Sequence, residues 1–314
     1  MKPLVPFEPV KARAKEMPTG ANWISQLKWD GVRMLTYFQD GQIELYNRRR
    51  NERTRHYPEL GEVSRYRSAN SLILDGEVIA MREGKPSFYE VMKRDGIRHT
   101  HQIQGRIQRV PVHYMVFDLL YLNGEWVTSR PLRERQALLQ EVVRPDETVQ
   151  LVESFTDHHA LSRFAKDHDL EGIVFKDMSS TYVINGKDDR WRKQKNHQEL
   201  IAVVGGVTFR GAVVNALLLG LYDEEGRLWH IGNAGGGKVS QREWQELTEA
   251  MPSLAQEACP FVHVPAGTKQ MRWTRPLLTV KVQYLEWAEG HMLRQPTILG
   301  FVAIPPQECR FSSI

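Results

Sequence analysis

The pattern of apolar residues changes near residue 198, and this change constrains the fold more than any other feature of the sequence. Before it, short runs rich in β-branched and aromatic residues alternate with amphipathic segments whose apolar residues recur every three or four positions. After it, short strand-like runs follow one another with one amphipathic segment among them. A chain of 314 residues exceeds the size at which a single core stops growing. We therefore expect two domains, residues 1–197 and 198–314.

The first region predicts an α+β domain built on antiparallel sheets, because it lacks the strict alternation of strand and helix that makes a parallel sheet. Helices are expected over Glu134–Val142 and Asp157–Asp167, with Asp157 as a helix N-cap. The expected strands are Trp23–Leu27, Arg33–Phe38, Ile43–Tyr46, Ser71–Ala80, Val112–Leu120, Gln150–Phe155 and Gly172–Lys176.

The second region predicts a small closed β-barrel of the oligonucleotide-binding (OB) kind. One helix is expected near Ser240–Met251, and Asp223-Glu-Glu-Gly226 is typical of a tight turn. The expected strands are Leu200–Phe209, Ala216–Tyr222, Arg227–Ile231, Phe261–Val264, Leu277–Trp287 and Ile298–Ile304.

Charge and cysteine content narrow the class of function. Lys and Arg total 42 against 38 Asp and Glu, which mildly favours anionic partners. No apolar run approaches the roughly 18 residues that cross a bilayer, and the N-terminus lacks the apolar core of a secretory signal. The two cysteines, Cys259 and Cys309, lack metal-ligand spacing. We therefore expect a cytoplasmic protein without a Cys-based zinc site or a disulfide framework.

The segment Gln26-Leu-Lys28-Trp-Asp30-Gly-Val-Arg33 places a lysine between a strand-like run and an Asp-Gly turn. A lysine amine with a pKa near 10.4 is a poor nucleophile at neutral pH. Partial burial and neighbouring cations would lower that pKa and free the lone pair. Taken alone, such a segment is more often a surface lysine beside a turn.

Further groups of charged residues follow this lysine in a fixed order. They are Leu74-Asp75-Gly76-Glu77, Phe117-Asp118, Glu171-Gly172-Ile-Val-Phe-Lys176 and Trp191-Arg-Lys193-Gln-Lys195. Each alone has an ordinary structural explanation, such as a hairpin turn or a solvated strand face. Lys193 and Lys195 lie two positions apart, so on a strand both face the same side.

In this order and at these spacings the groups resemble the signature of the covalent nucleotidyltransferases, which comprise DNA ligases, RNA ligases and mRNA capping enzymes. More specifically, residues 20–301 are similar to the ligase domain of bacterial ligase D, the end-joining ligase. That similarity includes Tyr57-Pro-Glu-Leu60, Asn123-Gly124, Arg190-Trp191, Arg275-Pro-Leu-Leu, Val282-x-Tyr284-x-Glu286-Trp287 and Leu293-Arg294-x-Pro296-x-x-x-Gly300. The resemblance implies an adenylation domain, with an ATP-grasp-like arrangement of antiparallel sheets and helices, followed by an OB-fold domain.

The resemblance also implies an ATP-dependent DNA ligase of bacterial repair. Lys28 would attack the α-phosphate of ATP, expel pyrophosphate and carry AMP to a 5′-phosphate, and a 3′-hydroxyl would then displace the AMP. ATP and Mg²⁺ or Mn²⁺ are the implied cofactors. The implied partners of a monomeric enzyme are duplex DNA with nicks or ends, contacted mainly at phosphates, and a Ku-like end-binding protein.

Two other interpretations remain. The first is an RNA ligase or a capping enzyme with the same lysine chemistry, which labelling with ATP and with GTP would separate. The second is a nucleic-acid-binding protein with a decayed site. The joint presence of Lys28, Glu77, Glu171, Lys193 and Lys195 argues against that decay.

The residue roles follow from the same resemblance. Phe117 would stack on adenine, and Gln26, where the family usually has Glu, would accept a hydrogen bond from the adenine amine. Glu171 is the expected metal ligand; Glu77 is a second candidate ligand that more often contacts the ribose. The complete expected nucleotide-binding set is Gln26, Lys28, Arg33, Arg48, Glu77, Phe117, Glu171, Lys193 and Lys195.

Two segments depart from the family pattern. The family usually continues Arg48 with Asn-Gly, whereas this chain reads Arg48-Arg49-Arg50, followed by Arg53 and Arg55. A glycine-dependent turn is therefore in doubt, and a solvated basic face and a contact to the DNA backbone are both open. The last motif usually ends in Arg-x-Asp-Lys, which reaches the ATP pyrophosphate, but this chain reads Gly300-Phe-Val-Ala-Ile304-Pro-Pro. Either other residues orient the pyrophosphate or the first step is slow.

Two further signals favour ordinary structure. Gly232-Asn-Ala-Gly-Gly-Gly237-Lys238 has the spacing of a phosphate-binding loop, but Val239 stands where Ser or Thr would hold Mg²⁺. A barrel turn is expected there, with Lys238 near the DNA backbone. His99-Thr-His101 and His158-His159 lack carboxylates at metal-ligand spacing and are expected to be exposed to solvent.

Overall fold

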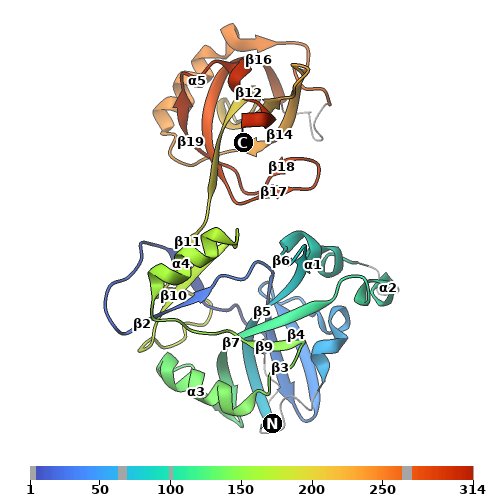
Figure 1. Ribbon diagram of the computed structural model, residues 1–314, viewed down its shortest axis with the longest axis vertical. Coiled ribbons are helices and arrows are strands. Elements are labelled where there is room, and N and C mark those ends of the chain that lie inside the picture. Colours follow the sequence, from blue (N-terminus) through green and yellow to red (C-terminus); the bar gives the residue numbers. More distant parts are fainter. Residues whose placement is uncertain (1–4, 63–68, 99–101, 264–270, 314) are drawn as a thin grey trace. The chain divides into compact units, whose positions relative to one another are not determined.

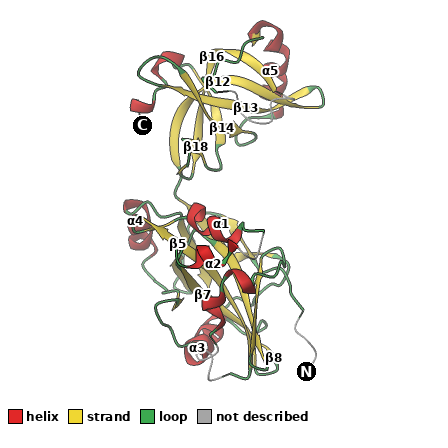
Figure 2. Cartoon of the chain, turned by 90° about the vertical axis from the view of Figure 1, so that its right-hand side faces the viewer, coloured by secondary structure: helices red, strands yellow, loops and turns green. Residues whose placement is uncertain are grey.

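The computed structural model describes residues 5–62, 69–98, 102–263 and 271–313. The chain divides into two compact units, Met1–Asn196 and His197–Ile314 (Figures 1 and 2). Strands predominate in both, and the expected α+β class is confirmed. None of the described helices is long and apolar enough to cross a membrane.

A seven-stranded sheet forms the larger layer of the first unit. Its strands run in the order β4-β3-β5-β7-β8, with β6 paired to β5 and β9 paired in parallel to β7. The other pairings are antiparallel, as expected from the sequence. The strands are β3 Val32–Gln39, β4 Gln42–Asn47, β5 Ser71–Arg82, β6 Lys85–Pro86, β7 Val112–Leu122, β8 Glu125–Trp126 and β9 Val149–Leu151.

A four-stranded sheet in the order β1-β11-β10-β2 forms the second layer. Its strands are β1 Lys11–Ala14, β2 Trp23–Leu27, β10 Gly172–Asp177 and β11 Lys187–Lys195. Strand β1 pairs in parallel with β11 and was not expected from the sequence. In its sequence, KARA, basic residues alternate with alanines. The strand therefore lacks the large apolar side chains from which the other strands were predicted.

Helices pack on the outer faces of these sheets. The expected helices are confirmed as α3 Leu132–Val142 and α4 His158–Asp167, and the Asp157 side chain caps α4 by accepting a hydrogen bond from the Ala160 N–H at 2.8 Å. Two helices were not predicted: α1 Phe88–Asp95, capped by Ser87, and the short α2 Gln104–Ile107.

The second unit is OB-fold-like, as expected. Its six-stranded sheet has the order β14-β13-β12-β16-β15, with β19 paired to β16, and a separate β17-β18 pair. Helix α5 Gln241–Leu254 begins at a capping box between Ser240 and Glu243. The strands are β12 Gln198–Arg210, β13 Val213–Tyr222, β14 Leu228–Ala234, β15 Ala255–Gln256, β16 Met271–Tyr284, β17 Trp287–Ala288, β18 Met292–Leu293 and β19 Thr297–Val302.

One expected strand is absent from the described residues, and the glycine-rich segment has a packing explanation. The strand expected over Phe261–Val264 is wrong for the residues described, because Phe261 forms only one bridge, to Leu228, and Val264 lies outside them. The glycine-rich segment, expected to be a turn, begins as the end of β14, which runs to Ala234; only the residues after it leave that strand, and Gly237 bridges to Ile298 of β19. A Cβ on Gly237, at φ +113°, would lie 2.1 Å from the Ile298 carbonyl oxygen, so close backbone approach explains this glycine.

The histidine pairs have different outcomes. His158 is half-buried rather than exposed, and its Nδ1 lies 3.0 Å from the Ser25 hydroxyl, which corrects the expectation. His159 is exposed. His99 and His101 both lie outside the described residues. Within the described part of the chain, no group of three or more His, Cys, Asp or Glu side chains could hold a metal ion.

Candidate active site

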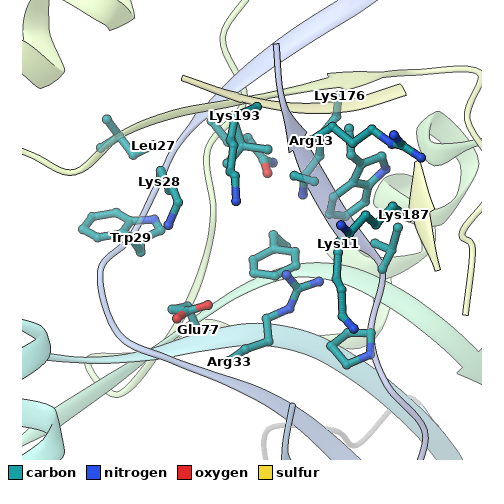
Figure 3. A pocket seen from close by; sticks show the side chains of 18 of the residues that line it. Lys11, Arg13, Leu27, Lys28, Trp29, Arg33, Glu77, Lys176, Lys187 and Lys193 are labelled. Carbon is teal, nitrogen blue, oxygen red and sulfur yellow. The ribbon is translucent and has the colours of Figure 1, made fainter. Parts of the chain in front are cut away.

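A cavity of about 660 Å³ lies in the first unit and is lined by residues of both sheets (Figure 3). Its walls include Gln26 and Lys28 from the β2 region, Lys193 from β11, and Phe117 from β7. The expected nucleotide-binding residues that line it are Gln26, Lys28, Arg33, Arg48, Glu77, Phe117 and Lys193. The structure thus brings together in one cavity residues that are spread over more than half of the chain.

Lys28 directly follows β2, and its backbone N–H donates to the Gly172 carbonyl at 2.9 Å, which fixes it beside β10. Its amine forms an ion pair with one carboxylate oxygen of Glu171. The other oxygen of Glu171 lies 3.0 Å from the Lys195 amine. The Glu171 carboxylate therefore bridges Lys28 and Lys195. Glu171 and Lys195 do not themselves line the cavity.

The charges around Glu171 act on each other. Burial acts to raise the pKa of Glu171, but the Lys28 and Lys195 ammonium groups outweigh it and hold this pKa below its ordinary value. Burial lowers the pKa of Lys193, and Lys195 and Lys28 lower it further by repulsion. The site therefore keeps an ionised carboxylate among three lysines.

Glu77 lies on β5 directly opposite Arg33 of β3. Its carboxyl group faces the cavity on the same side as Trp29 (Figure 3). Burial raises the pKa of Glu77 to about 8, against the opposing effect of Lys28 and Arg33. A carboxyl group in this state is mostly protonated at neutral pH, so it can both donate and accept a hydrogen bond.

Arg33 is held by a buried carboxylate. Its Nε and Nη2 atoms each lie 2.5 Å from an oxygen of Asp75, and the Tyr182 hydroxyl donates to Asp75 at 2.5 Å. The Arg33 guanidinium also lies 4.6 Å from the centre of the Phe117 ring. The guanidinium is therefore partly occupied, and the two N–H groups of Nη1 and one of Nη2 are the donors left for a ligand.

Gln26 is buried and lies in the wall of the cavity. Its amide nitrogen donates to the Ser154 hydroxyl at 3.0 Å and lies 3.5 Å from the Val152 carbonyl oxygen. These two contacts fix the amide nitrogen toward the β9 side. The amide oxygen is then the atom left to accept a hydrogen bond from a ligand.

Lys176 is a site residue whose role the motif pattern does not predict. Its side chain is 2% exposed and lines the cavity, yet its amine has no hydrogen-bond partner among the described residues. The amine lies 4.2 Å from the ring centre of Phe117 and 4.0 Å from that of Trp191. Burial lowers the pKa of Lys176 to about 7, partly offset by Asp118. Strand alternation could have found it, because Gly172, Val174 and Lys176 face one side of β10.

The cavity wall is strongly basic. Among the described residues that line it, Glu77 is the single acid, whereas Lys11, Arg13, Lys15 and Lys187 of the β1–β11 edge add to the expected cations. Figure 3 shows Lys11 and Lys187 across the cavity from Lys28. The buried indole N–H groups of Trp29 and Trp191, both in the wall, also have no acceptor in the described part of the chain. An anionic ligand rich in acceptor oxygens fits this arrangement.

Comparisons with known proteins agree on one family. Residues 6–195 match the family described as "ATP dependent DNA ligase domain", and residues 210–301 match "ATP dependent DNA ligase C terminal region". The multifunctional non-homologous end joining protein LigD of Pseudomonas aeruginosa is 30% identical over 304 residues, which cover 93% of this chain and 35% of that protein. A DNA ligase of Archaeoglobus fulgidus is 31% identical over 260 residues, covering 79% of this chain and 45% of that protein.

Solved structures give the same result. The mycobacterial DNA ligase D complexed with ATP and MES has a TM-score of 0.56 and 27% identity, covering 96% of this chain and 97% of that one. The ligase domain of Mycobacterium tuberculosis LigD has a TM-score of 0.52 and 26% identity, with the same coverage of 96% and 97%. The chain spans about a third of the length of the LigD proteins it matches.

Proposed function

The chain belongs to the ATP-dependent DNA ligase family, and from this premise we propose that it seals breaks between a 5′-phosphate and a 3′-hydroxyl in DNA through AMP carried on Lys28. The observation that carries the proposal is the placement of the Lys28 amine in a basic cavity next to a carboxylate and two further lysines.

In the first step the Lys28 nitrogen forms a bond to the α-phosphorus of ATP while the bond to the β-phosphate oxygen breaks and pyrophosphate leaves. The amine must lose a proton for this attack. That proton passes to solvent, and the ion pair with Glu171 has to open before the nitrogen can reach the phosphorus. Lys193 and Lys195 would then neutralise charge on the α-phosphate, because phosphoryl transfer depends on positioning and charge neutralisation.

Gln26 and Lys176 would select adenine. The amide oxygen of Gln26 accepts a hydrogen bond from the 6-amino group, and the buried amine of Lys176 donates to a ring nitrogen. Guanine carries an acceptor and a donor in the places where adenine carries a donor and an acceptor. The predicted stacking of Phe117 on the base is supported by the position of its ring in the cavity wall.

Glu77 and Arg33 would bind the ribose. A protonated Glu77 can donate to one ribose hydroxyl and accept from another, and Arg33, which keeps N–H donors beyond those bound to Asp75, lines the same cavity. Arg48, exposed where it lines the cavity, would reach the phosphates.

A divalent cation such as Mg²⁺, when bound, would supply charge neutralisation on the phosphates. Mg²⁺ needs few protein carboxylates because it keeps waters and binds substrate phosphates. Glu171 fits this role, since its carboxylate is ionised and lies next to Lys28. Glu77 fits less well as a ligand, because its raised pKa favours the neutral form.

Duplex DNA with nicks or ends is the proposed substrate, and bacterial end joining is the proposed pathway. The support is the similarity to proteins described as multifunctional non-homologous end joining proteins, of which this chain matches one part. A Ku-like end-binding protein is the corresponding proposed partner. Comparing the sealing of nicked, cohesive and blunt duplexes, with and without such a protein, tests this part of the proposal.

The decisive experiment is mass measurement after incubation with ATP and Mg²⁺. The wild-type protein should gain the mass of one adenylyl group, and Lys28→Ala should gain none. Lys166→Ala, which removes an exposed lysine of α4 outside the cavity, should gain it as the wild type does. GTP in place of ATP should give no adduct of its own. A wild type that never gains the group, or a Lys28→Ala variant that still gains it, contradicts the proposal.

A further inference from the structure

The loop after β4 is a three-residue hairpin connection in which arginine takes the place that suits glycine. The Asn47 N–H donates to the Asn51 carbonyl at 3.0 Å, and the Arg50 N–H donates to the Asn47 carbonyl at 2.8 Å. The Asn47 side chain accepts from the Arg49 and Asn51 N–H groups at 3.0 and 3.1 Å. Arg50 has φ +64°, the left-handed conformation at the last position of such a loop, where glycine is preferred. The turn that was in doubt from the sequence therefore exists, with Arg50 in a strained backbone conformation.

The basic segment divides into two parts with different surroundings. Arg53 is half-buried and ion-paired to Asp95 at 3.2 Å, so it belongs to the packing under α1. Arg48, Arg49 and Arg50 are exposed, and none of them forms an ion pair among the described residues. The field of Arg48 and Arg50 reaches Glu8, but that carboxylate is already paired to Lys11 at 2.5 Å.

The fold itself does not explain three consecutive exposed arginines at this loop. Like charges at adjacent positions repel, and a left-handed arginine is less stable than glycine there. Arg48 lines the cavity that holds Lys28, so Arg49 and Arg50 extend the same loop from the cavity wall into solvent. A polyanion that passes the cavity mouth would relieve this repulsion and would meet donors in the bidentate geometry that suits phosphate.

We propose that Arg49 and Arg50 bind the phosphate backbone of the DNA strand beside the break. They act in DNA binding and not in the reaction with ATP. The proposal rests on the proposed function. It predicts two roles within one loop: Arg48 contacts the nucleotide in the cavity, and the next two residues contact the duplex.

The test uses the full chain and a nicked duplex whose 3′ end is dideoxy-terminated, so that binding is measured without sealing. Arg50→Gly removes one charge and also the backbone strain, which separates binding from folding. Arg49→Ala/Arg50→Gly removes both charges, and Arg49→Lys/Arg50→Lys keeps them. Arg144→Ala removes one exposed arginine that does not line the Lys28 cavity and serves as the matched control. Each variant is measured for affinity from 50 to 200 mM salt, for melting temperature and for the single-turnover rate of AMP charging.

The double variant should bind roughly tenfold or more weakly per lost arginine at 0.1 M salt, and the slope of log K against log salt should fall by about 2. Arg50→Gly should melt at or above the temperature of the wild type while still losing about one unit of slope. The lysine pair should keep most of the affinity, and Arg144→Ala should match the wild type. Charging with AMP should keep its rate and its KM for ATP in every variant.

A double variant with wild-type affinity and salt slope overturns the proposal. So does a double lysine variant that loses as much DNA affinity as the Arg49→Ala/Arg50→Gly variant. A raised KM for ATP with unchanged DNA affinity would assign these arginines to the ATP phosphates instead and also overturns it. The proposed function fails separately, if the wild type itself acquires no AMP.

Discussion

Lys176 and Glu77 line the same cavity, and burial favours the neutral form of each side chain. Burial raises the pKa of Glu77 to about 8 and lowers that of Lys176 to about 7. Near neutral pH the Glu77 carboxyl group is therefore mostly neutral and the Lys176 amine is about half neutral, although their sequence neighbours suggest an ion-rich site. A neutral donor and a neutral carboxyl group suit the uncharged adenosine half of ATP, whereas the charged lysines near Glu171 suit its phosphates.

Replacing Lys176 by methionine should stabilise the ligand-free protein and weaken its reaction with ATP. The folded-state pKa of Lys176 is depressed to about 7 from 10.5, so the stability linked to its neutral form is present above pH 10.5 and is lost as pH falls toward 7. The melting temperature of Lys176→Met should therefore exceed that of the wild type by a margin that grows from pH 9.5 to pH 7. Thermal melts at three pH values, with the KM for ATP in charging, check this. An equal margin at all pH values would contradict a buried, titrating amine.

Glu77→Gln should show the opposite pH dependence. The folded-state pKa of Glu77 is raised to about 8 from 4.5, so its contribution to stability is fully present below pH 4.5 and is lost as pH rises through 8. The wild type should lose melting temperature relative to Glu77→Gln between pH 5 and pH 8. The same variant keeps a donor and an acceptor for the ribose, so its KM for ATP should rise only a few-fold. A difference that stays constant over this range would show that Glu77 is ionised in the folded protein.

The sequence predicted which residues line the cavity better than it predicted their surroundings. Lys28, Glu77 and Lys193 were found from the order of short charged groups, and the structure places all three in one cavity. The ion pair of Arg33 with Asp75 and the burial of Lys176 were not predicted. The first joins two neighbouring strands of one sheet, and the second depends on the Phe117 ring of the opposite sheet, so neither follows from neighbours in the chain. The roles of all these residues remain predictions.

At the scale of elements, a buried ion pair joins helix α3 to strand β7 beneath the cavity. Asp118 and Arg135 are both fully buried and meet through two hydrogen bonds of 2.8 and 2.9 Å. Arg135 also donates to the carbonyl oxygens of Arg130 and Ser180 at 2.7 and 2.8 Å. Asp118 directly follows Phe117, so this network fixes the part of β7 that presents the ring to the cavity.

Asp118→Asn should destabilise the first unit strongly, because it leaves the Arg135 guanidinium buried without a counter-charge. Breaking one side of a buried pair typically costs about 3–5 kcal/mol. The double change Asp118→Leu/Arg135→Met should recover part of that loss, although two carbonyl oxygens lose their donor. Urea unfolding monitored by tryptophan fluorescence measures both. A single variant as stable as the wild type would show that the pair adds nothing to stability.

Strands with apolar alternation were predicted and charged strands were not. Strand β2 was predicted at its observed ends, and β5 and β7 to within two residues. Strand β1 was not predicted because its charged residues alternate with alanines rather than with large apolar side chains, and because its partner β11 lies more than 170 residues away along the chain. Both strands line a polar cavity, so the alternation that marks a half-apolar strand is absent by necessity.

At the scale of the whole molecule, the segment that usually ends in Arg-x-Asp-Lys serves packing in this chain. Phe301 and Ile304 pack against the core of the second unit. The Thr279 hydroxyl of β16 lies 2.8 and 2.9 Å from the carbonyl oxygens of Val302 and Ile304. Apolar side chains take the place of the family's charged ones here, so this segment offers no charged side chain to pyrophosphate.

Charging with AMP should therefore be slower than sealing. Removing a single preorganised donor from a developing anion typically lowers a rate by roughly 10²-fold, and only the charging step expels pyrophosphate. Single-turnover sealing by protein charged beforehand should accordingly outpace self-adenylation by at least about that factor at saturating ATP. Rapid-quench measurements of both steps on one preparation decide the matter. If the two rates are equal and fast, the cations of the first unit orient the leaving group by themselves, and combined replacement of Lys11 and Lys187 by alanine should then slow charging while leaving the sealing of pre-charged protein unchanged.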